Sequence, residues 1–515
     1  MNSQEILNLC FEKGLLIDDE ILRLFSELDE ESVGIFIEKV KTLRQRIITK
    51  KILDKNKEKM NELFLALPEE NQKKFEKFKI KFGLNIEISR EIKIEETKKE
   101  EGMQDVKSSV RFISAQVPNN KPEVKDFVKH FRNRFLEMKK ILETRNELKN
   151  LRSIDKVSGS RGEFSLIGLV SNKITTKNNN FLIEIEDLTG KTRLLIGNKK
   201  SELYAKAEEI SLDSVLGFKG FGNNEIIFVN EIIFPESLLQ ERKKSPIEEY
   251  VLFIGDLHCG SKLFLEKNFL NFIDFLNDKN NPEAGKIKYL FVLGDVVSGV
   301  GNYPGQEKDL EIVDLEKQLG KLAQLLGKIR KDIAIIISSG NHDGIRLMEP
   351  QPEIDKKYAW PLYELENVTF TGNPAFVNIG AGENFSGFDV LTYHGTSYIY
   401  YANNIRHLIS SKAMNSPTKI MKYLLKNRHL APTHTSVQYF PLEDDVLMIK
   451  KIPDIFVSGH LHKSEISYYN NILLISNSSW ESITPYEEKM GSNPDFCKVP
   501  MFNLKTREIK ILDFE

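Results

Sequence analysis

The amino-terminal part of the chain repeats apolar residues at the spacing of an α-helix. Between residues 3 and 84 they recur three and four positions apart, and acidic or capping residues stand at 18–19 and 29–32, where helices would begin. The pattern predicts a small all-α domain over residues 1–85. No cluster of metal-binding residues lies in this region, so we expect an interaction module.

Two segments of different character follow. Residues 86–122 mix opposite charges and then Ser, Asn and Pro, with few large apolar side chains, which favours a flexible linker. Residues 123–152 place apolar side chains, from Phe127 to Leu142, on one side of an amphipathic helix and Lys and Arg on the other. The basic side is expected to contact phosphate or, as is commoner, to lie in solvent.

From residue 160 to residue 237 the apolar spacing changes from helical to alternating. Five short runs rich in β-branched and aromatic residues are separated by turn residues, and a helical stretch lies between the third and fourth runs. This arrangement resembles an OB-fold β-barrel. Such a barrel can be a DNA-binding platform or a packing module, and the sequence leaves both open. Residues 235–249 predict a linker.

Apolar strands alternate with helical segments over residues 248–515, which predicts a layered α/β domain. The expected fold class is therefore multidomain: a small all-α amino-terminal domain, an OB-fold barrel and an α/β domain. A chain of 515 residues is long enough for several cores.

The charge balance and the cysteine content limit the kinds of protein that this chain can be. The 73 Lys and Arg nearly balance the 75 Asp and Glu, so there is no global basic field of the kind that marks a stand-alone nucleic-acid binder. The three cysteines show no paired spacing, which favours a reducing compartment. The first residues lack a secretory signal, and no apolar run could span a bilayer. We expect a cytoplasmic protein with no membrane partner.

Metal-binding residue types follow five apolar runs of the last domain. In an extended strand, residues two apart point the same way, so Asp256 with His258 and His460 with His462 are each expected to face one ion. Oxygen and imidazole donors without thiolate suit Mn²⁺ better than a structural zinc site. The five clusters are Asp256-Leu-His258, Gly294-Asp295, Gly340-Asn341-His342-Asp343, Tyr393-His394 and Gly459-His460-Leu-His462.

Adjacent residues in the third cluster suggest different roles. Asp295 follows the buried run 289–293 and is the expected bridge, because a carboxylate has two oxygens to share between two ions. Asn341 is expected as a neutral ligand, which leaves His342 to stabilise phosphate or protonate the leaving oxygen. Asp343 is expected to orient His342. We expect no role for Cys259 and structural roles for His429 and His434.

The order of these motifs over residues 250–485 resembles the calcineurin-like metallophosphoesterase superfamily. The resemblance implies two divalent ions, Mn²⁺ with Mg²⁺ as the alternative. It places one ion on Asp256, His258 and His462, the other on Asn341, His394 and His460, and shares Asp295 between them. It implies in-line hydrolysis of a phosphoester and no further cofactor.

Further segments resemble the small subunits of the archaeal family D DNA polymerases. They are 303–307 (Tyr-Pro-Gly-Gln-Glu), 348–352, 426–432 and 499–503. This resemblance implies a metal-dependent 3′–5′ exodeoxyribonuclease that proofreads single-stranded or mismatched DNA 3′ ends, with a large partner subunit that polymerises. Related eukaryotic accessory subunits have lost metal ligands, whereas here every ligand position is filled, so we expect retained activity.

Two alternatives remain open from the sequence. The chain can be mainly a scaffold for the large subunit with little catalysis of its own. The general motifs also permit a metal-dependent protein phosphatase or phosphodiesterase, which a barrel in front of the site makes less favourable.

Overall fold

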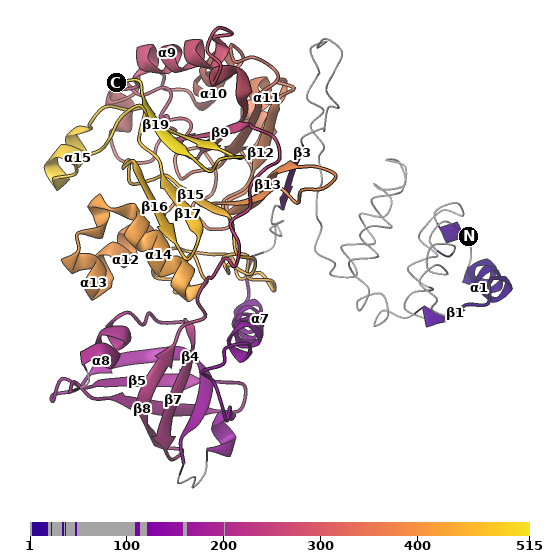
Figure 1. The fold of residues 1–515 in the computed structure, drawn as a ribbon, viewed down its shortest axis with the longest axis vertical. Helices are drawn as coiled ribbons and strands as arrows, with labels where there is room; N and C mark the ends of the chain where they lie inside the picture. Colours follow the sequence, from indigo (N-terminus) through magenta and orange to yellow (C-terminus); the bar gives the residue numbers. More distant parts are fainter. Residues whose placement is uncertain are drawn as a thin grey trace. The chain divides into compact units, whose positions relative to one another are not determined.

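A computed structural model describes residues 3–18, 22, 33–34, 37, 47–48, 109–113, 121–157, 162–199 and 201–515. The chain divides into two units, residues 1–88 and residues 89–515 (Figure 1). The described part of the first unit contains helix α1 (Ser3–Glu12) and two short parallel strands, β1 (Leu16–Ile17) and β2 (Ile47–Ile48). Helix α1 lies in the predicted all-α region, whereas the strand pair was not predicted. Most of the other helices predicted over 1–85 fall outside the described residues.

Two six-stranded sheets form the centre of the α/β domain. The first has the order β12-β11-β10-β9-β18-β19 and the second the order β16-β17-β15-β14-β13-β3. The strands of the first sheet are β9 (Tyr250–Gly255), β10 (Ile287–Leu293), β11 (Ala334–Ser338), β12 (Val368–Thr371), β18 (Lys498–Asn503) and β19 (Ile509–Asp513). Those of the second are β3 (Ser109–Ile113), β13 (Ala375–Ala381), β14 (Phe388–Thr392), β15 (Ile455–Ser458), β16 (Glu465–Tyr469) and β17 (Ile472–Ser476).

Alternation along each strand explains the layers. In β9, Val251 and Phe253 join the core between the two sheets, whereas Leu252 and Ile254 pack toward the helices outside the first sheet. Both faces are covered, which is why these strands are continuous apolar runs. Helices α9 (Glu266–Asn277), α10 (Leu315–Leu326) and α11 (Lys356–Tyr363) cover the first sheet, and α12 (Tyr398–Asn404), α13 (Arg406–Ser410) and α14 (Pro417–Asn427) cover the second. The layered α/β prediction is confirmed.

Short elements connect these layers. They are the 3₁₀ turns η2 (Ala284–Lys286), η3 (Gln306–Lys308) and η4 (Ala413–Asn415), together with helix α15 (Pro485–Met490). Among the described residues, no helix has the length and apolar character needed to cross a membrane.

Strand β3 corrects part of the linker prediction. It pairs antiparallel with β13, and its Val110 is buried. Residues 109–113 (Ser-Val-Arg-Phe-Ile) alternate in the manner of a strand, a pattern that the charged residues before them obscured. The prediction of a flexible linker over 86–122 was therefore wrong for these five residues, and 86–108 and 114–120 lie outside the described part.

The five predicted β-runs form a closed barrel with the order β4-β5-β6-β8-β7. Strands β6 and β8 pair in parallel, and β4 closes the barrel against β7 in antiparallel register. The barrel strands are β4 (Phe164–Thr175), β5 (Phe181–Glu186), β6 (Lys191–Ile196), β7 (Val215–Gly222) and β8 (Ile226–Ile233), with the 3₁₀ turn η1 (Ile154–Lys156) before them and α8 (Ser201–Glu208) after β6.

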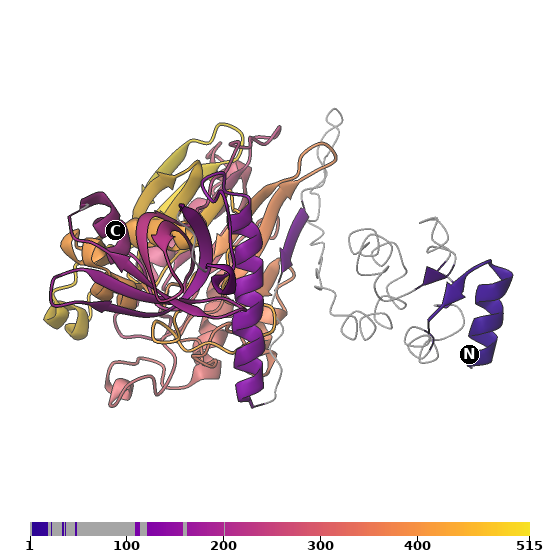
Figure 2. The ribbon, with the colours of Figure 1, turned by 90° about the horizontal axis from the view of Figure 1, so that it is seen from below.

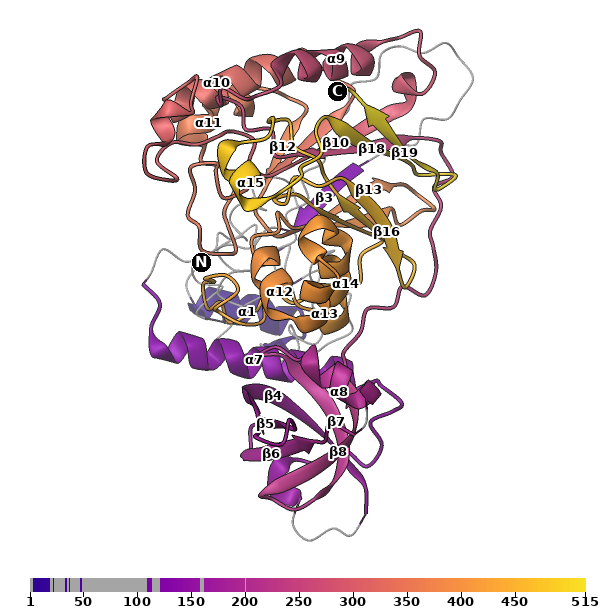
Figure 3. The same cartoon turned by 90° about the vertical axis from the view of Figure 1, so that its left-hand side faces the viewer.

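Helix α7 (Val124–Glu143) runs along the side of the barrel (Figure 2). Figure 3 shows it between the barrel and the helices that cover the second sheet. Its Phe135, Met138 and Leu142 pack against the barrel, as the amphipathic pattern predicted. Much of the basic side lies in solvent, as expected, with Lys125, Lys129 and Arg132 exposed, whereas Arg134 is buried.

Arg134 makes a buried ionic contact with the α/β domain. Its Nε donates to Asp445 Oδ2 at 2.6 Å, and its Nη1 donates to the carbonyl of Pro432. His429 Nε2 lies 2.9 Å from the same carboxylate oxygen, and His130 lies 3.5 Å away. Burial raises the pKa of Asp445, but Arg134 and His429 lower it further, so its pKa lies well below the usual range. The helix is thus joined to the α/β domain by a paired charge.

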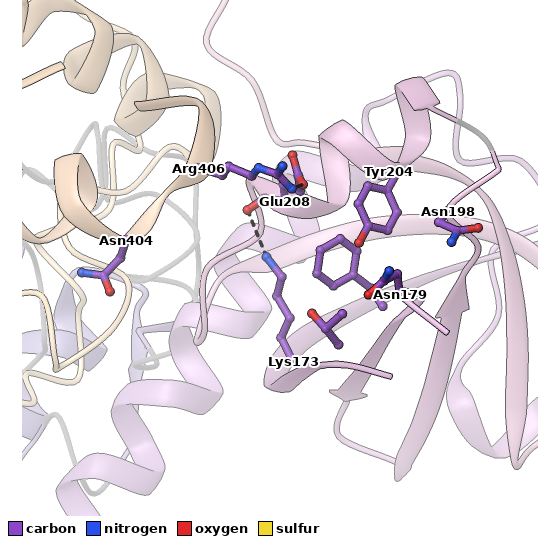
Figure 4. A pocket seen from close by; sticks show the side chains of 9 residues that line it. Lys173, Asn179, Asn198, Tyr204, Glu208, Asn404 and Arg406 are labelled. Atoms are coloured by element: carbon purple, nitrogen blue, oxygen red, sulfur yellow. Dashed lines mark hydrogen bonds and ion pairs between the residues drawn. The ribbon is translucent and has the colours of Figure 1, made fainter. Parts of the chain in front are cut away.

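The barrel also contacts the α/β domain at the end of α8. Glu208 pairs with Arg406, Glu209 pairs with Lys426, and Tyr423 Oη donates to the carbonyl of Glu209 at 2.9 Å. A polar cavity of about 610 Å³ lies beside this junction (Figure 4). In it, Lys173 Nζ donates to the carbonyls of Glu208 and Ile210. The cavity wall includes none of the predicted metal ligands.

The segment predicted as a linker between barrel and α/β domain is hydrogen-bonded along its length. The Glu236 amide donates to the Lys426 carbonyl at 3.0 Å, and Ser237 Oγ donates to the Leu425 carbonyl at 2.8 Å. Further along, Lys243 Nζ donates to Asp454 Oδ2 at 2.8 Å. The segment therefore fastens the barrel to the domain that follows.

We expect Arg134→Ala to destabilise the second unit by about 3–5 kcal/mol, because it leaves the buried Asp445 charge without its main partner. Guanidinium unfolding measures this change. The exposed neighbour Arg132 gives a matched control, and Arg132→Ala should change the free energy by less than about 0.5 kcal/mol. Equal effects from the two variants would show that Arg134 contributes only helix propensity.

Burial lowers the pKa of His429 to about 4. An unfolded histidine titrates near 6.5, so between pH 6.5 and 4 the unfolded chain binds the extra proton and the folded chain does not. The free energy of unfolding should fall over this window by up to roughly 3 kcal/mol. Unfolding curves at several pH values should show a smaller fall for His429→Gln, whereas His407→Gln, which removes a partly exposed histidine whose pKa burial also lowers, should stay closer to the wild type.

Candidate metal centre

The predicted ligands meet because they follow strands whose carboxyl ends share one edge. Strands β9, β10 and β11 are parallel neighbours in the first sheet, and they are followed by Asp256, Asp295 and Asn341. Strands β14 and β15 are parallel neighbours in the second sheet, and they are followed by His394 and His460. Ligands of an α/β domain gather at such carboxyl ends.

The backbone turns sharply at most of these residues. Asp256, His258, Asp295, His460 and His462 all have φ between 46° and 71°, in the left-handed region. The expectation that Asp256 and His258 converge because they lie two apart in an extended strand was therefore wrong in its reason, and the same holds for His460 and His462. Non-glycine residues in this region cost of order 1–3 kcal/mol each and concentrate at functional sites.

Glycines allow the strand ends to approach closely. A Cβ on Gly294, which has φ 65°, would lie 2.3 Å from His394 Nδ1. A Cβ on Gly459 would lie 2.5 Å from Asp256 Oδ2. Side chains at these two positions would push the candidate ligands apart, which explains why a glycine directly precedes Asp295 and His460.

The first candidate ion site contains Asp256, His258 and His462, whose ligand atoms all lie within 4.8 Å of one another. His258 Nε2 lies 3.2 Å from His462 Nε2, and His462 Nε2 lies 3.6 Å from Asp256 Oδ1. Two imidazole nitrogens this close favour a cation between them, because at most one can donate to the other.

The second candidate ion site contains Asp295, His394 and His460, again with ligand atoms within 4.8 Å. His394 Nε2 lies 3.2 Å from Asp295 Oδ2 and 3.0 Å from Asn341 Oδ1. The structure thus brings all seven predicted ligands together in two adjoining groups. One contact joins the groups, since the His460 amide donates to both oxygens of Asp256 at 3.0 Å.

The electrostatics of the site suit bound cations. Burial raises the pKa of Asp256 to about 6. Burial alone would lower the pKa of His394, but Asp295 and Asp256 raise it to about 9. Burial lowers the pKa of His460 to about 3. Buried carboxylates and imidazoles must share protons when no cation is present, and divalent ions would take the place of those protons. The residues therefore fit a pair of divalent ions.

No thiolate competes for these ions. Cys259 stands between Asp256-His258 and the next strand, but its Sγ is directed at the Gln318 carbonyl at 3.9 Å. Burial raises the pKa of its thiol to about 12, so it is a protonated core residue, in line with the expectation of no chemical role.

His342 and Asp343 have different surroundings from those expected. His342 Nδ1 lies 3.0 Å from the Ser298 carbonyl and 3.0 Å from Asn302 Nδ2. The oxygens of Asp343 accept instead from the backbone amides of Gly340 and Val297, at 2.7 and 3.2 Å. The interpretation of Asp343 as the residue that orients His342 is therefore corrected: Asp343 shapes the loop, and Ser298 and Asn302 contact the ring.

Other neighbours of the site were not identified from the sequence. Glu487 Oε1 lies 2.8 Å from His462 Nδ1, and Glu481 Oε2 lies 3.9 Å from His258 Nδ1. The motif Thr484-Pro-Tyr-Glu487 predicts a helix start, but nothing in it indicates a contact with a histidine 25 residues earlier.

The chain resembles known proteins in both sequence and domain content. Residues 250–464 match the calcineurin-like phosphoesterase family. The "DNA polymerase II small subunit" of Methanocaldococcus jannaschii is 36% identical over 74% of this chain and 64% of the relative. The protein of that name from Methanothermobacter thermautotrophicus is 35% identical over 76% of this chain and 80% of the relative.

A third relative extends the match. The Thermoplasma acidophilum protein of the same name is 33% identical over 81% of this chain and 86% of the relative. The chain thus spans less than two thirds of some of these relatives and more than three quarters of others. A solved archaeal phosphodiesterase covers 51% of the chain at 13% identity, with a TM-score of 0.26, too low to support any inference.

Addition of Mn²⁺ to the metal-free chain should raise its melting temperature. At a free Mn²⁺ concentration of 100 times the dissociation constant, each bound ion should add about 2.7 kcal/mol to the free energy of unfolding. Asp256→Asn keeps an acceptor for the His460 amide but removes the charge, so most of one ion's gain should be lost. Differential scanning calorimetry with and without Mn²⁺ measures both effects. Asp274→Asn, on the exposed side of α9, is the control. An equal gain in Asp256→Asn and wild type would exclude Asp256 as a ligand.

Proposed function

Because the chain belongs to the family of DNA polymerase II small subunits, we propose that it is the small subunit of a two-subunit replicative DNA polymerase and that its metal centre hydrolyses phosphodiester bonds in DNA. Its substrates are single-stranded or mismatched 3′ ends, from which it removes nucleotides for proofreading. The large subunit is the partner that polymerises. The observation that carries the proposal is that both groups of candidate ligands are complete and that Asp256, His258, Asp295 and His394 among them are buried.

The residues have distinct roles in this proposal. One ion would be held by Asp256, His258 and His462, and the other by Asn341, His394 and His460. Asp295 would be shared, since its Oδ2 lies 3.2 Å from His394 Nε2 and a carboxylate has a second oxygen to offer another ion. When bound, two divalent ions supply an activated water and offset the charge of the phosphate. Mn²⁺ is the ion we propose, with Mg²⁺ as the alternative.

His342 is the residue we propose to act on the phosphate. Its ring lies 5.0 Å from the ring of His258, edge to face, so it borders the first ion site without belonging to it. The Ser298 carbonyl can accept a hydrogen bond from Nδ1–H, which leaves Nε2 as the nitrogen that meets a phosphate or leaving oxygen.

We interpret the barrel as an OB-fold that serves chiefly as a packing module. The strand order, the parallel pairing of β6 with β8 and the position of α8 support that topology. Its contacts through Glu208 and Glu209 support the packing role. A replicative subunit of this kind would act in the cytoplasm.

Nucleotide release from labelled single-stranded and 3′-mismatched DNA, with Mn²⁺ and the complex of both subunits, tests this function. Asp295→Ala should lower the rate more than about 100-fold, since it removes a proposed ligand whereas loss of a residue that only supports a ligand costs 10–100-fold. Asp274→Ala should release nucleotides at the wild-type rate.

Other results would select a different function. An unchanged rate in Asp295→Ala would contradict hydrolysis at this site. Wild-type release by the complex carrying His342→Ala would favour a scaffold role for this chain. Rapid turnover of phosphoserine peptides without release from DNA would indicate a protein phosphatase.

A further inference from the structure

The short helix α15 places a carboxylate against one of the candidate metal ligands. Glu487 Oε1 lies 2.8 Å from His462 Nδ1. The other oxygen, Oε2, accepts from the amide and the hydroxyl of Thr484 at 2.9 and 2.8 Å. The Thr484 hydroxyl in turn accepts from the Glu487 amide at 3.2 Å. This capping box leaves Glu487 with one oxygen fixed by its own helix and one oxygen directed at the histidine.

The contact with Glu487 determines which nitrogen of His462 can bind a cation. A carboxylate only accepts hydrogen bonds, so Nδ1 must carry the proton. In the neutral ring, Nε2 then presents its lone pair, and Nε2 is the atom that faces His258 and Asp256. Glu487 therefore holds the tautomer and the ring orientation that an ion at the first site requires.

Other histidines of the centre lack an equivalent contact in the described part of the chain. Glu481 lies 3.9 Å from His258 Nδ1, beyond hydrogen-bond distance. His394 Nδ1 is buried and has no hydrogen-bond partner among the described residues. The anchored carboxylate thus acts on the first ion site and not on the second.

Helix α15 is short and largely exposed. It has six residues, and the side chain of Tyr486 is 71% exposed. The side chain of Glu487 is 17% exposed and that of His462 14% exposed, so this contact is more buried than the helix around it. The contact between Glu487 and His462 is therefore placed to hold the orientation of the His462 ring.

We propose that Glu487 is a positioning residue that orients His462 and sets the affinity of the ion held by Asp256, His258 and His462. The inference rests on the two-ion centre of the proposed function. It makes α15 a part of one ion site, although the helix supplies no ligand itself.

Titration of the metal-free full chain with Mn²⁺, with free Mn²⁺ followed by electron paramagnetic resonance, tests the proposal. The wild type should bind two ions tightly. Glu487→Ala should keep one tight ion and bind the other about 10–100-fold more weakly, as expected when a carboxylate that supports a histidine ligand is lost. Glu487→Gln should fall between them, because its amide oxygen can still accept from Nδ1.

The exposed Glu488 provides the matched control on the same helix. Glu488→Gln loses the same charge and should bind two ions as the wild type does. Two unchanged affinities in Glu487→Ala, or an equal loss at both sites, would overturn the positioning role while leaving the two-ion function in place. A wild-type chain that binds no Mn²⁺ would overturn the two-ion function itself.

Discussion

The architecture of the α/β domain depends on the burial of several charged and imidazole groups at one place. Asp256 and His394 are fully buried, and Asp295 is nearly so. Such groups are costly in a low-dielectric interior unless opposite charges and hydrogen bonds compensate them. The left-handed turns and the close-approach glycines are the local means of compensation, because they bring carboxylates and imidazoles within reach of one another. The surrounding sheets must be rigid enough to hold this strained arrangement.

Much of this arrangement was predictable because it follows from position along strands. Continuous apolar runs such as 289–293 indicated strands covered on both faces, and the residue types after them indicated a metal centre. The sequence could not show how the chain leaves each strand. Asp256 and His258 converge because the backbone turns tightly at both residues. The sequence pattern predicted the same pair, but on the assumption that both residues lie in an extended strand. The order of residue types along the chain gives their spacing, but it does not tell whether the backbone at a residue has a positive or a negative φ.

Contacts between distant segments were the least predictable. Arg134 looked like one of many basic residues on a helix, and only the fold brings Asp445 to it across 311 positions. The same holds for Asp343, whose neighbours are backbone amides that any sequence would provide. A buried charge pair of this kind specifies a docking geometry more than it adds stability. His130 and His429 lie beside this pair, and burial lowers the pKa of both rings.

Strand β3 and the segment after the barrel together give the barrel an unusual place in the chain. β3 belongs to the second sheet of the α/β domain but precedes the barrel in sequence, and residues from 236 onward return to the same domain. The barrel is thus an insertion whose two ends are both fastened to one host domain. A chain that started at the barrel would lack β3, so the barrel would be joined to the α/β domain at one end only. The edge of β13 would also be left unpaired and open to pairing with another molecule.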